Sequence, residues 1–381
     1  MSTINRFILL FIISIFFLSG CWSSTDIEHL SMVIGVGLDK NQDTDQEDLA
    51  VTYQVANVTD TTSSLENSEQ SDKPYRNYEE TGNSLLKSAY DINYKTPNPF
   101  FTQHQRLIVI SSELAQQTSL QELLDHFIRN PESRASSMVI ITDGVARDVL
   151  ESDDPADIPA HLITGIIQTS KSSRILEPIS LVNLLPKLNT NTSFLLQNVV
   201  KEEDEITFKG AAVINGTTLK LMGFLTESDL QGAIWLTAST DSGIINVYDE
   251  EKEHSIVYEI NSLKSDITPT LKNNELSFNV EIESEGWVSE VFNESDEITK
   301  EEQLDKLEKL LKEQVESYIG NSLRKLQEEF QVDAIDFRKY VRINYPTYWK
   351  EHKDNWDEIF SQTAIEYDVN ITVTDYGMVD K

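Results

Sequence analysis

The 381-residue sequence predicts a mixed α/β (α+β) protein, a three-domain ectodomain in which mixed sheets are flanked by helices. Three observations predict this class. Apolar strand patterns alternate with helical patterns over the first half, strand patterns dominate after residue 190, and a long amphipathic helix precedes one last strand. Alternating strands and helices favour layered α/β architecture, and about 360 residues beyond an N-terminal signal suffice for two or three domains.

Residues 21–189 are predicted to form an N-terminal α/β domain. Its expected strands span residues 30–38, 49–58, 106–111 and 138–142. Residues 59–77 are almost entirely polar and predict an exposed loop. A helix is expected to start at Ser119, because Glu122 follows it at capping-box spacing. Further helices are expected around residues 85–92, 145–150, 158–167 and 179–188.

Residues 190–254 are predicted to form a small sheet-rich middle domain. The pair Asn215-Gly216 predicts a tight hairpin turn between two strands. Strands are expected over residues 194–200, 206–214, 219–225 and 244–248, with a helix over residues 229–236.

Residues 255–381 are predicted to form a C-terminal α/β domain with a long helix. Strands are expected over residues 256–260 and 276–283, and over residues 365–373, where apolar side chains alternate. Residues 301–330 carry a single apolar stripe, which predicts a helix buried against a sheet in preference to a partner helix. Gly320, in the middle of that helix, predicts a bend or close packing.

The N-terminus predicts export and lipid attachment. Residues 1–20 combine one basic residue, Arg6, with an apolar stretch from Phe7 to Phe17, which is typical of a signal peptide. The stretch is shorter than the roughly 20 residues that span a bilayer. Cys21 is the only cysteine and follows Leu-Ser-Gly, as in a bacterial lipoprotein signal. We therefore expect cleavage before Cys21 and a lipid anchor on its thiol.

Charge and cysteine content limit the partners. The chain has 64 acidic and 31 basic residues, a net charge of −33, which repels nucleic acid and anionic phospholipid. We therefore expect no nucleic-acid partner, and protein partners that are neutral, basic or bound through local patches. With Cys21 lipidated no disulfide can form, so the folded body depends on its own cores.

No motif for catalysis or for a cofactor is present in the sequence. It contains neither a G-x-S-x-G elbow nor an H-E-x-x-H pair, and its six histidines are scattered. Gly35 and Gly37 predict close packing, since a phosphate loop would need further signals. The acidic positions between Asp39 and Glu47 lack the glycine and glutamate of a calcium loop. We expect no enzyme activity, no cofactor and no metal.

One C-terminal stretch stands out as a structural or interface cluster. Tyr345-Pro346 predicts the end of a helix, because proline disfavours the α region in the residue before it. Trp349 and Trp356 lie close by in sequence and suit a small aromatic core. Together with Arg342 they would also suit a partner-facing patch, since Trp, Tyr and Arg dominate interface hot spots.

Several separated segments together resemble the Ger(x)C family, the C-subunit lipoproteins of bacterial spore nutrient-germinant receptors. Cys21-Trp22 with Asp26-Ile27-Glu28 and the run from Ile34 to Asp39 resemble the family's start, although Ser23 replaces its usual acidic residue. The other matching segments are His104 with Leu107–Glu113, Gly210–Val213 with Gly223, Gly232 and Trp235, and Asp333, Asp336 and Phe337 with Arg342–Trp349 and Trp356.

This resemblance implies a non-enzymatic receptor subunit with three α/β-type domains. It implies a location on the outer surface of the spore's inner membrane and assembly with two integral-membrane subunits, A and B. Nutrient binding to such a complex leads to dipicolinate release. Two rival functions remain at this point: a solute-binding lipoprotein of a transporter, expected to show two similar lobes, and an envelope hydrolase, expected to depend on one carboxylate.

Overall fold

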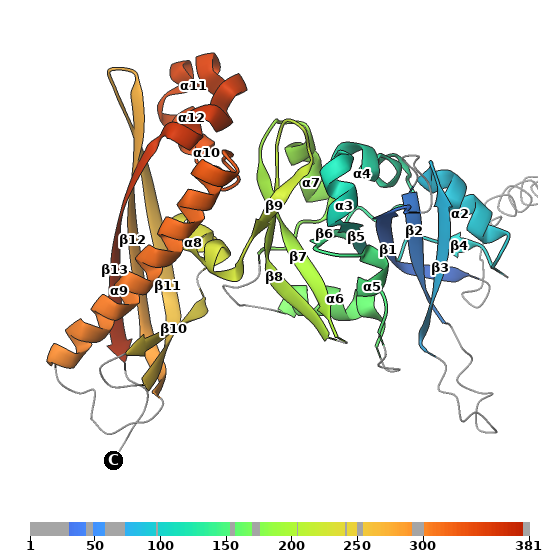
Figure 1. Cartoon of the computed structure of the whole chain (residues 1–381), viewed down its shortest axis with the longest axis horizontal. Helices are drawn as coiled ribbons and strands as arrows, with labels where there is room; N and C mark the ends of the chain where they lie inside the picture. The colour runs from blue at the N-terminus through green and yellow to red at the C-terminus, as the bar shows by residue number, and fades with distance from the viewer. Residues whose placement is uncertain are drawn as a thin grey trace, which may run out of the picture.

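Two mixed sheets organise the chain (Figure 1). The computed structural model describes residues 30–42, 49–57, 73–96, 98–152, 157–169, 176–203, 205–240, 242–249, 254–291 and 301–375. The first sheet is built from strands before residue 226, and the second from strands after residue 242. The predicted mixed α+β class is confirmed.

The first sheet has a parallel centre and antiparallel edges. Its strand order is β3-β2-β1-β5-β6-β7-β8-β9, and the short β4 also pairs with β1. Pairs β1·β5, β5·β6 and β6·β7 are parallel, the last through a single bridge, and the outer pairs are antiparallel. The strands are β1 (Ser31–Lys40), β2 (Leu49–Ala56), β3 (Tyr75–Gly82), β4 (Phe100–Phe101), β5 (Leu107–Ser111), β6 (Met138–Thr142), β7 (Phe194–Glu202), β8 (Glu205–Ile214) and β9 (Leu221–Leu225).

Helices cover both faces of this sheet. One face packs against α2 (Leu85–Asn93), α3 (Ser112–Gln117), α4 (Leu120–Arg129) and α7 (Leu181–Leu188). The other packs against α5 (Ala146–Val149) and α6 (Pro159–Thr169). Burial on both faces explains the continuous apolar runs of β5 and β6. It also explains Gly35, because a Cβ there would lie 2.9 Å from the Cβ of Ala160.

The second sheet has the order β10-β11-β12-β13, with β13 parallel to β12. Its strands are β10 (Gly243–Asp249), β11 (His254–Lys272), β12 (Glu275–Val291) and β13 (Ala364–Asp375). Strands β11 and β12 form one long hairpin, far longer than the predicted ranges 256–260 and 276–283. Alternate residues of β12 are buried, so one face of the sheet packs on the core and the other remains open.

Two helices cover most of the buried face of the second sheet, and the short helices after residue 337 pack beside them on the same core. α9 (Glu301–Arg324), extended by the π-helical turn η2 (Lys325–Glu329), buries its predicted apolar stripe. It packs against β13 and β10, as predicted, and also closely against α8 (Glu227–Thr237). The close crossing is made at Gly232, where a Cβ would lie 2.0 Å from the carbonyl oxygen of Tyr318. A Cβ on Gly320 would lie 3.6 Å from the Tyr367 hydroxyl, an ordinary contact.

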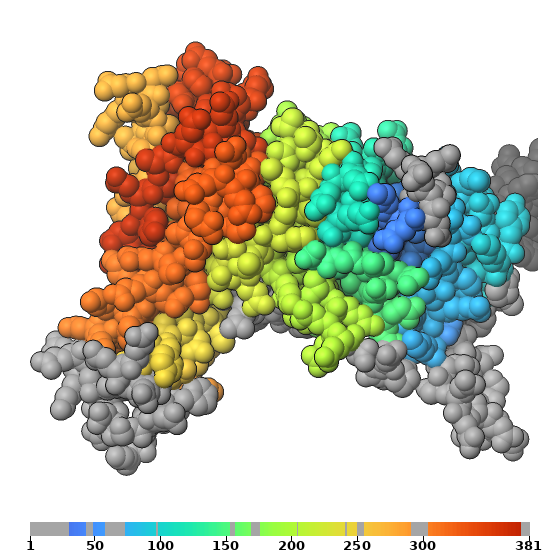
Figure 2. Space-filling model, in the orientation of Figure 1, coloured from blue at the N-terminus to red at the C-terminus, as the bar shows by residue number. Residues whose placement is uncertain are grey.

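The two halves share a core at the β8–β9 end of the first sheet. Leu195, Ala211, Val213 and Leu225 belong to the same apolar cluster as the second sheet and α9. The C-terminal helices contact this end in the space-filling view (Figure 2). Strands β7–β9 therefore continue the first sheet, whereas β10 belongs to the second. The strands of the predicted middle domain, residues 190–254, divide between the two sheets, and its boundaries stay a prediction.

Two local predictions were wrong. Residues 75–77, assigned to a loop, begin the edge strand β3, whose polar sequence gives no apolar signal. The connection from β8 to β9 runs from residue 215 to residue 220 and is not a tight two-residue turn. Asn215 shapes it, since its side-chain oxygen accepts from the backbone N–H groups of Thr217 and Thr218 at 3.0 and 2.8 Å.

Candidate interface at the C-terminal helices

Three short helices carry the predicted aromatic cluster. α10 (Arg338–Asn344) ends just before Tyr345, and Pro346 is the first residue of α11 (Pro346–His352). This confirms the helix end that Tyr345-Pro346 predicted. The first position of a helix suits proline, because that N–H has no partner within the helix. α12 (Trp356–Gln362) follows and leads into β13.

Tyr345 protects the edge of the long hairpin. β10 pairs with β11 only as far as Ile260, so among the described residues no strand lies beside the remainder of β11 on that edge. The Tyr345 hydroxyl accepts from the backbone N–H of Leu271 at 3.3 Å and donates to the carbonyl of Pro269 at 3.4 Å. An uncovered edge would offer a template for unwanted strand pairing. Tyr345 thus has a role inside this fold.

Trp349 and Trp356 form an edge-to-face pair with ring centroids 5.6 Å apart. Trp356 is buried, whereas Trp349 is half-buried. The guanidinium carbon of Arg338 lies 5.7 Å from the centroid of the Trp349 ring, within cation–π range. Of the two alternatives, a small aromatic core or a partner-facing patch, these contacts favour the aromatic core for both tryptophans.

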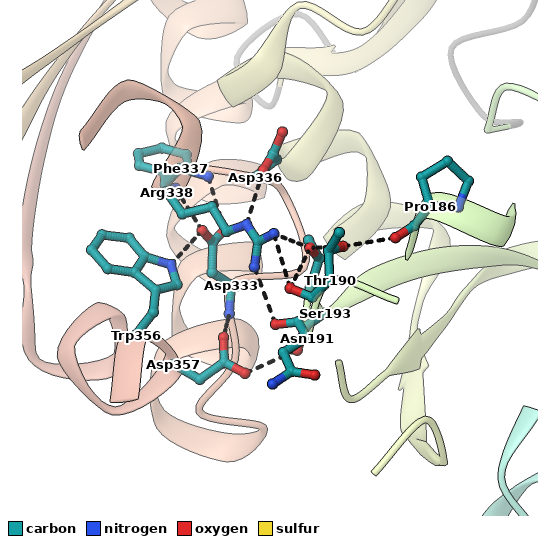
Figure 3. A network of polar contacts seen from close by, with 11 residues as sticks. Pro186, Thr190, Asn191, Ser193, Asp333, Asp336, Phe337, Arg338, Trp356 and Asp357 are labelled. Atoms are coloured by element: carbon teal, nitrogen blue, oxygen red, sulfur yellow. Dashed lines mark hydrogen bonds and ion pairs between the residues drawn. The ribbon is translucent and has the colours of Figure 1, made fainter. Parts of the chain in front are cut away.

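A buried carboxylate organises the cluster (Figure 3). Asp333 is fully buried, and its oxygens accept from the Trp356 indole N–H at 2.7 Å and from the backbone N–H groups of Phe337 and Arg338 at 3.0 and 2.8 Å. Burial raises the pKa of Asp333 to about 6, because the charged form loses its hydration, and the three hydrogen bonds oppose that rise.

A second carboxylate connects this cluster to the first sheet. Asp357 accepts from the backbone N–H of Asp333 at 3.0 Å and from the Ser193 hydroxyl at 3.0 Å. The Ser193 oxygen in turn accepts from the backbone N–H of Gly216 at 2.9 Å. A Cβ on Gly216 would lie 2.2 Å from the carbonyl carbon of Thr192, so only glycine permits this approach.

Arg338 completes the connection between the halves. Its guanidinium donates to the carbonyl of Asn191 at 3.1 Å and to the hydroxyl of Thr192 (Figure 3). It also lies 3.5 Å from a carboxylate oxygen of Asp336. Partial burial lowers the pKa of Arg338, while Asp336 and Asp333 oppose that effect. A fixed cation thus bridges the C-terminal helices and the loop that precedes β7.

Arg342 faces solvent beside this bridge. It lines a hollow of about 180 Å³ together with Pro186, Lys187, Thr190, Thr192, Asp336, Arg338 and Lys339. Burial lowers the pKa of Lys187, the charge of Asp336 opposes that effect, and the neighbouring Arg338 adds to it. Within the described ranges, neither Lys187 nor Lys339 nor Arg342 forms an ion pair with a carboxylate. The hollow is therefore a local basic patch on an acidic protein.

The structure brings all five C-terminal residues predicted from the sequence into one region. Tyr345, Pro346, Trp349 and Trp356 have roles within the fold, and Arg342 faces solvent. Sequence reasoning did not assign Asp333, Arg338, Asp357 or Ser193 to the site. An acidic residue directly after the apolar Val332 was a weak signal for Asp333, whereas nothing local marks Ser193 as the partner of Asp357, 164 positions away.

This arrangement suits contact more than chemistry. The oxygens of Asp333 and Asp357 are held by backbone, indole and hydroxyl donors. Over the described part of the chain, no three histidine, aspartate or glutamate side chains gather as a metal site would require. No helix in that part is long and apolar enough to cross a membrane. Cys21, the predicted lipidation site, lies outside the described residues.

Comparisons with known proteins cover nearly the whole chain. Residues 23–201 match the family described as spore germination protein N-terminal domain, and residues 209–377 match spore germination B3/GerAC like, C-terminal. Spore germination protein YndF of Bacillus subtilis is 34% identical over 95% of this chain and 94% of that protein. Spore germination protein A3 of the same organism is 31% identical over 94% and 95%.

A solved structure shares the fold. The crystal structure of the GerBC protein matches with a TM-score of 0.63 and 25% sequence identity, covering 91% of this chain and 99% of that one. The likeness therefore extends over both sheets and is not confined to one half.

Proposed function

Since this chain belongs to the Ger(x)C family of spore germination proteins, we propose that it is the lipid-anchored C subunit of a nutrient-germinant receptor. In this proposal it assembles with two integral-membrane subunits, A and B, and takes part in nutrient-triggered germination. The observation that carries the proposal is the match to germination proteins along almost the full length of both chains.

The proposed location is the outer surface of the spore's inner membrane. Signal residues 1–20 and the single cysteine at position 21 support a lipid anchor on Cys21. A lipoprotein cysteine carries at least two acyl chains, and two chains suffice for stable anchoring. Such an anchor suits this protein, because a net charge of −33 gives its surface little affinity for anionic lipid.

The proposed role is non-enzymatic. The contacts between the C-terminal helices and the loop that precedes β7, which we call the junction, support it. Its two inner carboxylates, Asp333 and Asp357, accept hydrogen bonds from backbone, indole and hydroxyl groups that join the C-terminal helices to the first sheet. We place the partner-facing patch at the basic hollow around Arg342, where Lys187 and Lys339 add positive charge. On a protein with twice as many acidic as basic residues, such a hollow favours an acidic or neutral partner surface.

The solute-binding alternative receives less support. Proteins of that class usually have two similar α/β lobes, whereas here a nine-stranded sheet is joined to a four-stranded one among the described residues. A stable complex between the purified ectodomain and a small molecule, with normal germination of spores lacking the chain, would favour that alternative.

Spores that lack only this chain provide the test. Dipicolinate release would be followed after a panel of nutrients and after a trigger that bypasses receptors. We expect the response to at least one nutrient to be lost, with the bypass intact and the response restored by the wild-type chain. Normal responses to every nutrient, in spores that also lack paralogous receptors, would contradict the proposal.

A further inference from the structure

The outer face of α2 carries an exposed apolar stripe. Leu86, Tyr90 and Tyr94 follow one another at four-residue spacing and are 52%, 60% and 87% exposed. The inner face is buried through Leu85 and Ile92, so the helix is held firmly while the stripe faces outward. Consecutive exposed apolar side chains on one face indicate a contact surface.

The stripe adjoins a groove of mixed character. Leu86 and Tyr90 line this groove of about 860 Å³ between α2 and α4, whose wall combines the apolar Phe100 and Phe127 with charged residues, which are Glu122, Asp125, Arg129 and Glu132. Tyrosine combines an apolar ring with a polar hydroxyl, and this combination favours the boundary between water and lipid.

The described part of the chain begins beside this stripe. The backbone N–H of Ser31 donates to the carbonyl of Pro99 at 3.0 Å, and Ser31 pairs with Phe100. The backbone N–H of Phe100 in turn donates to the side-chain oxygen of Asn93, the residue before Tyr94. The first strand therefore starts next to the C-terminal end of α2, at the end of the molecule opposite the second sheet (Figure 1).

The tether from this point to the lipidation site is short. Cys21 precedes Leu30 by nine residues, which span at most about 30 Å even when fully extended. A bilayer that holds the acyl chains on Cys21 would therefore lie within reach of α2. The second sheet, at the other end of the molecule, has no comparable constraint.

Charge around the stripe permits approach to lipid. The only acidic residue of α2, Asp91, lies 3.9 Å from the ammonium group of Lys87. Lys95, just beyond the helix, pairs with Glu80. The stripe is thus flanked by paired charges, in contrast to the strong negative charge of the whole chain.

We propose that the Leu86–Tyr90–Tyr94 stripe rests in the interfacial layer of the bilayer to which Cys21 is anchored, so that the first sheet stands on the membrane. The proposal rests on the lipid anchor of the proposed function. Its occupant is the lipid surface, and a membrane-embedded protein partner is the competing occupant.

The test uses the lipidated full-length chain in vesicles of phosphatidylglycerol and phosphatidylethanolamine. Because a thioether-linked Cys21 cannot react with a maleimide, a cysteine introduced by Tyr90→Cys becomes the only reactive thiol. An environment-sensitive dye is placed there. Tyr248→Cys, on β10, is the matched control, since that tyrosine is 56% exposed and lies in the other half of the molecule.

We expect dye at position 90 to shift its emission to the blue on reconstitution and to be quenched by nitroxide lipids, while dye at position 248 does neither. Equal, water-like emission from both positions would overturn the proposal. A shift at position 90 that requires added A and B subunits would also overturn it, in favour of a protein partner. Dye labelling of the unsubstituted chain would mean that Cys21 is not lipidated, so the anchor itself would have failed.

Discussion

Strands β5 and β6 of the first sheet are buried along their whole length, whereas β12 and β13 of the second bury alternate residues. Helices cover both faces of the first sheet, but α8 and α9 cover only one face of the second. The first sheet therefore contributes a closed body. The second leaves an acidic sheet face, with Glu281, Glu283 and Glu285, open to solvent. The two halves therefore differ in the kind of surface they expose: the first exposes the outer sides of its helices, and the second exposes a sheet face.

The largest changes in the free energy of unfolding are expected from substitutions in β6 and β12, which compare a strand buried on both faces with a strand buried on one. In β6, both Ile140→Ala and Ile141→Ala should lower the free energy of unfolding by about 2–5 kcal/mol, because both faces are buried. In β12, Ile282→Ala should cost as much, but Glu283→Ala should stay within about 0.5 kcal/mol. Urea unfolding followed by circular dichroism measures these differences. A large cost for Glu283→Ala would contradict the open face.

Glycine substitutions at the contact between α8 and α9 test how closely these two helices pack. Gly232→Ala should lower the free energy of unfolding by about 3 kcal/mol, because its methyl group would overlap the Tyr318 carbonyl. Gly320→Ala is the matched control in the neighbouring helix. It should raise stability by about 1 kcal/mol, since alanine favours helix and the added methyl meets no close neighbour. Equal effects from the two substitutions would mean that the helices are not so close.

Substitution of Asp333 tests the junction between the two halves through the pH dependence of the free energy of unfolding. At neutral pH, Asp333→Asn should lower the free energy of unfolding by about 2 kcal/mol, because an amide has only one acceptor oxygen. If that oxygen accepts from Arg338 and Trp356 as Oδ2 does, the amide NH₂ faces the backbone N–H of Phe337, which now donates to Oδ1. Asp336→Asn, at an exposed ion pair, should cost less than about 1 kcal/mol. Chemical denaturation across a pH series measures both variants.

The sign of the pH effect follows from the raised pKa. Asp333 has a pKa of about 6 in the folded protein against 3.8 for an ordinary aspartate. Between these values the folded state binds more protons than the unfolded state, so this group lowers stability as pH rises from about 4 to 6. Asp333→Asn should remove that component from the pH profile. An unchanged slope in the variant would contradict the burial of this carboxylate.

An effect as large as that of Asp333→Asn is expected at Trp349, on the outer side of the same cluster. Trp349→Ala should lower the free energy of unfolding by about 2 kcal/mol, because removal of this half-buried ring takes away a packing partner of Trp356 and Arg338. Trp349→Phe should recover part of the loss. Thermal unfolding and co-purification with the membrane subunits would be measured together. A fully stable Trp349→Ala protein that no longer assembles would place the ring at an interface instead.

Local patterns were sufficient for much of the fold. The capping position of Ser119 and the apolar face of α4 were readable, because a helix repeats its signal every turn. The length of the β11–β12 hairpin was underestimated, because the missed segments, residues 261–272 and 284–291, combine threonine, serine and charged residues with few apolar ones. The polar edge strand β3 was missed entirely for a related reason, since edge strands can lack an apolar pattern.

The site was less accessible to sequence reasoning. Trp349, Trp356 and Tyr345 attracted attention as large rings, but their partners could not be read from spacing. Ser193 meets Asp357 only because the loop before β7 folds against α12. Burial, which raises the pKa of Asp333, is likewise a property of the assembled junction. The lipid anchor on Cys21 stays a prediction from the sequence.

The most direct test of the central claim is made with Cys21→Ala as the only copy of the chain in spores. The chain in the membrane fraction is measured by immunoblot, and nutrient-triggered dipicolinate release is measured in the same spores. A lipid-anchored receptor subunit predicts that the variant leaves the membrane fraction and that the nutrient response it serves is lost or weakened. Full membrane retention with a normal response would contradict the account, because protein contacts alone would then hold the chain in place.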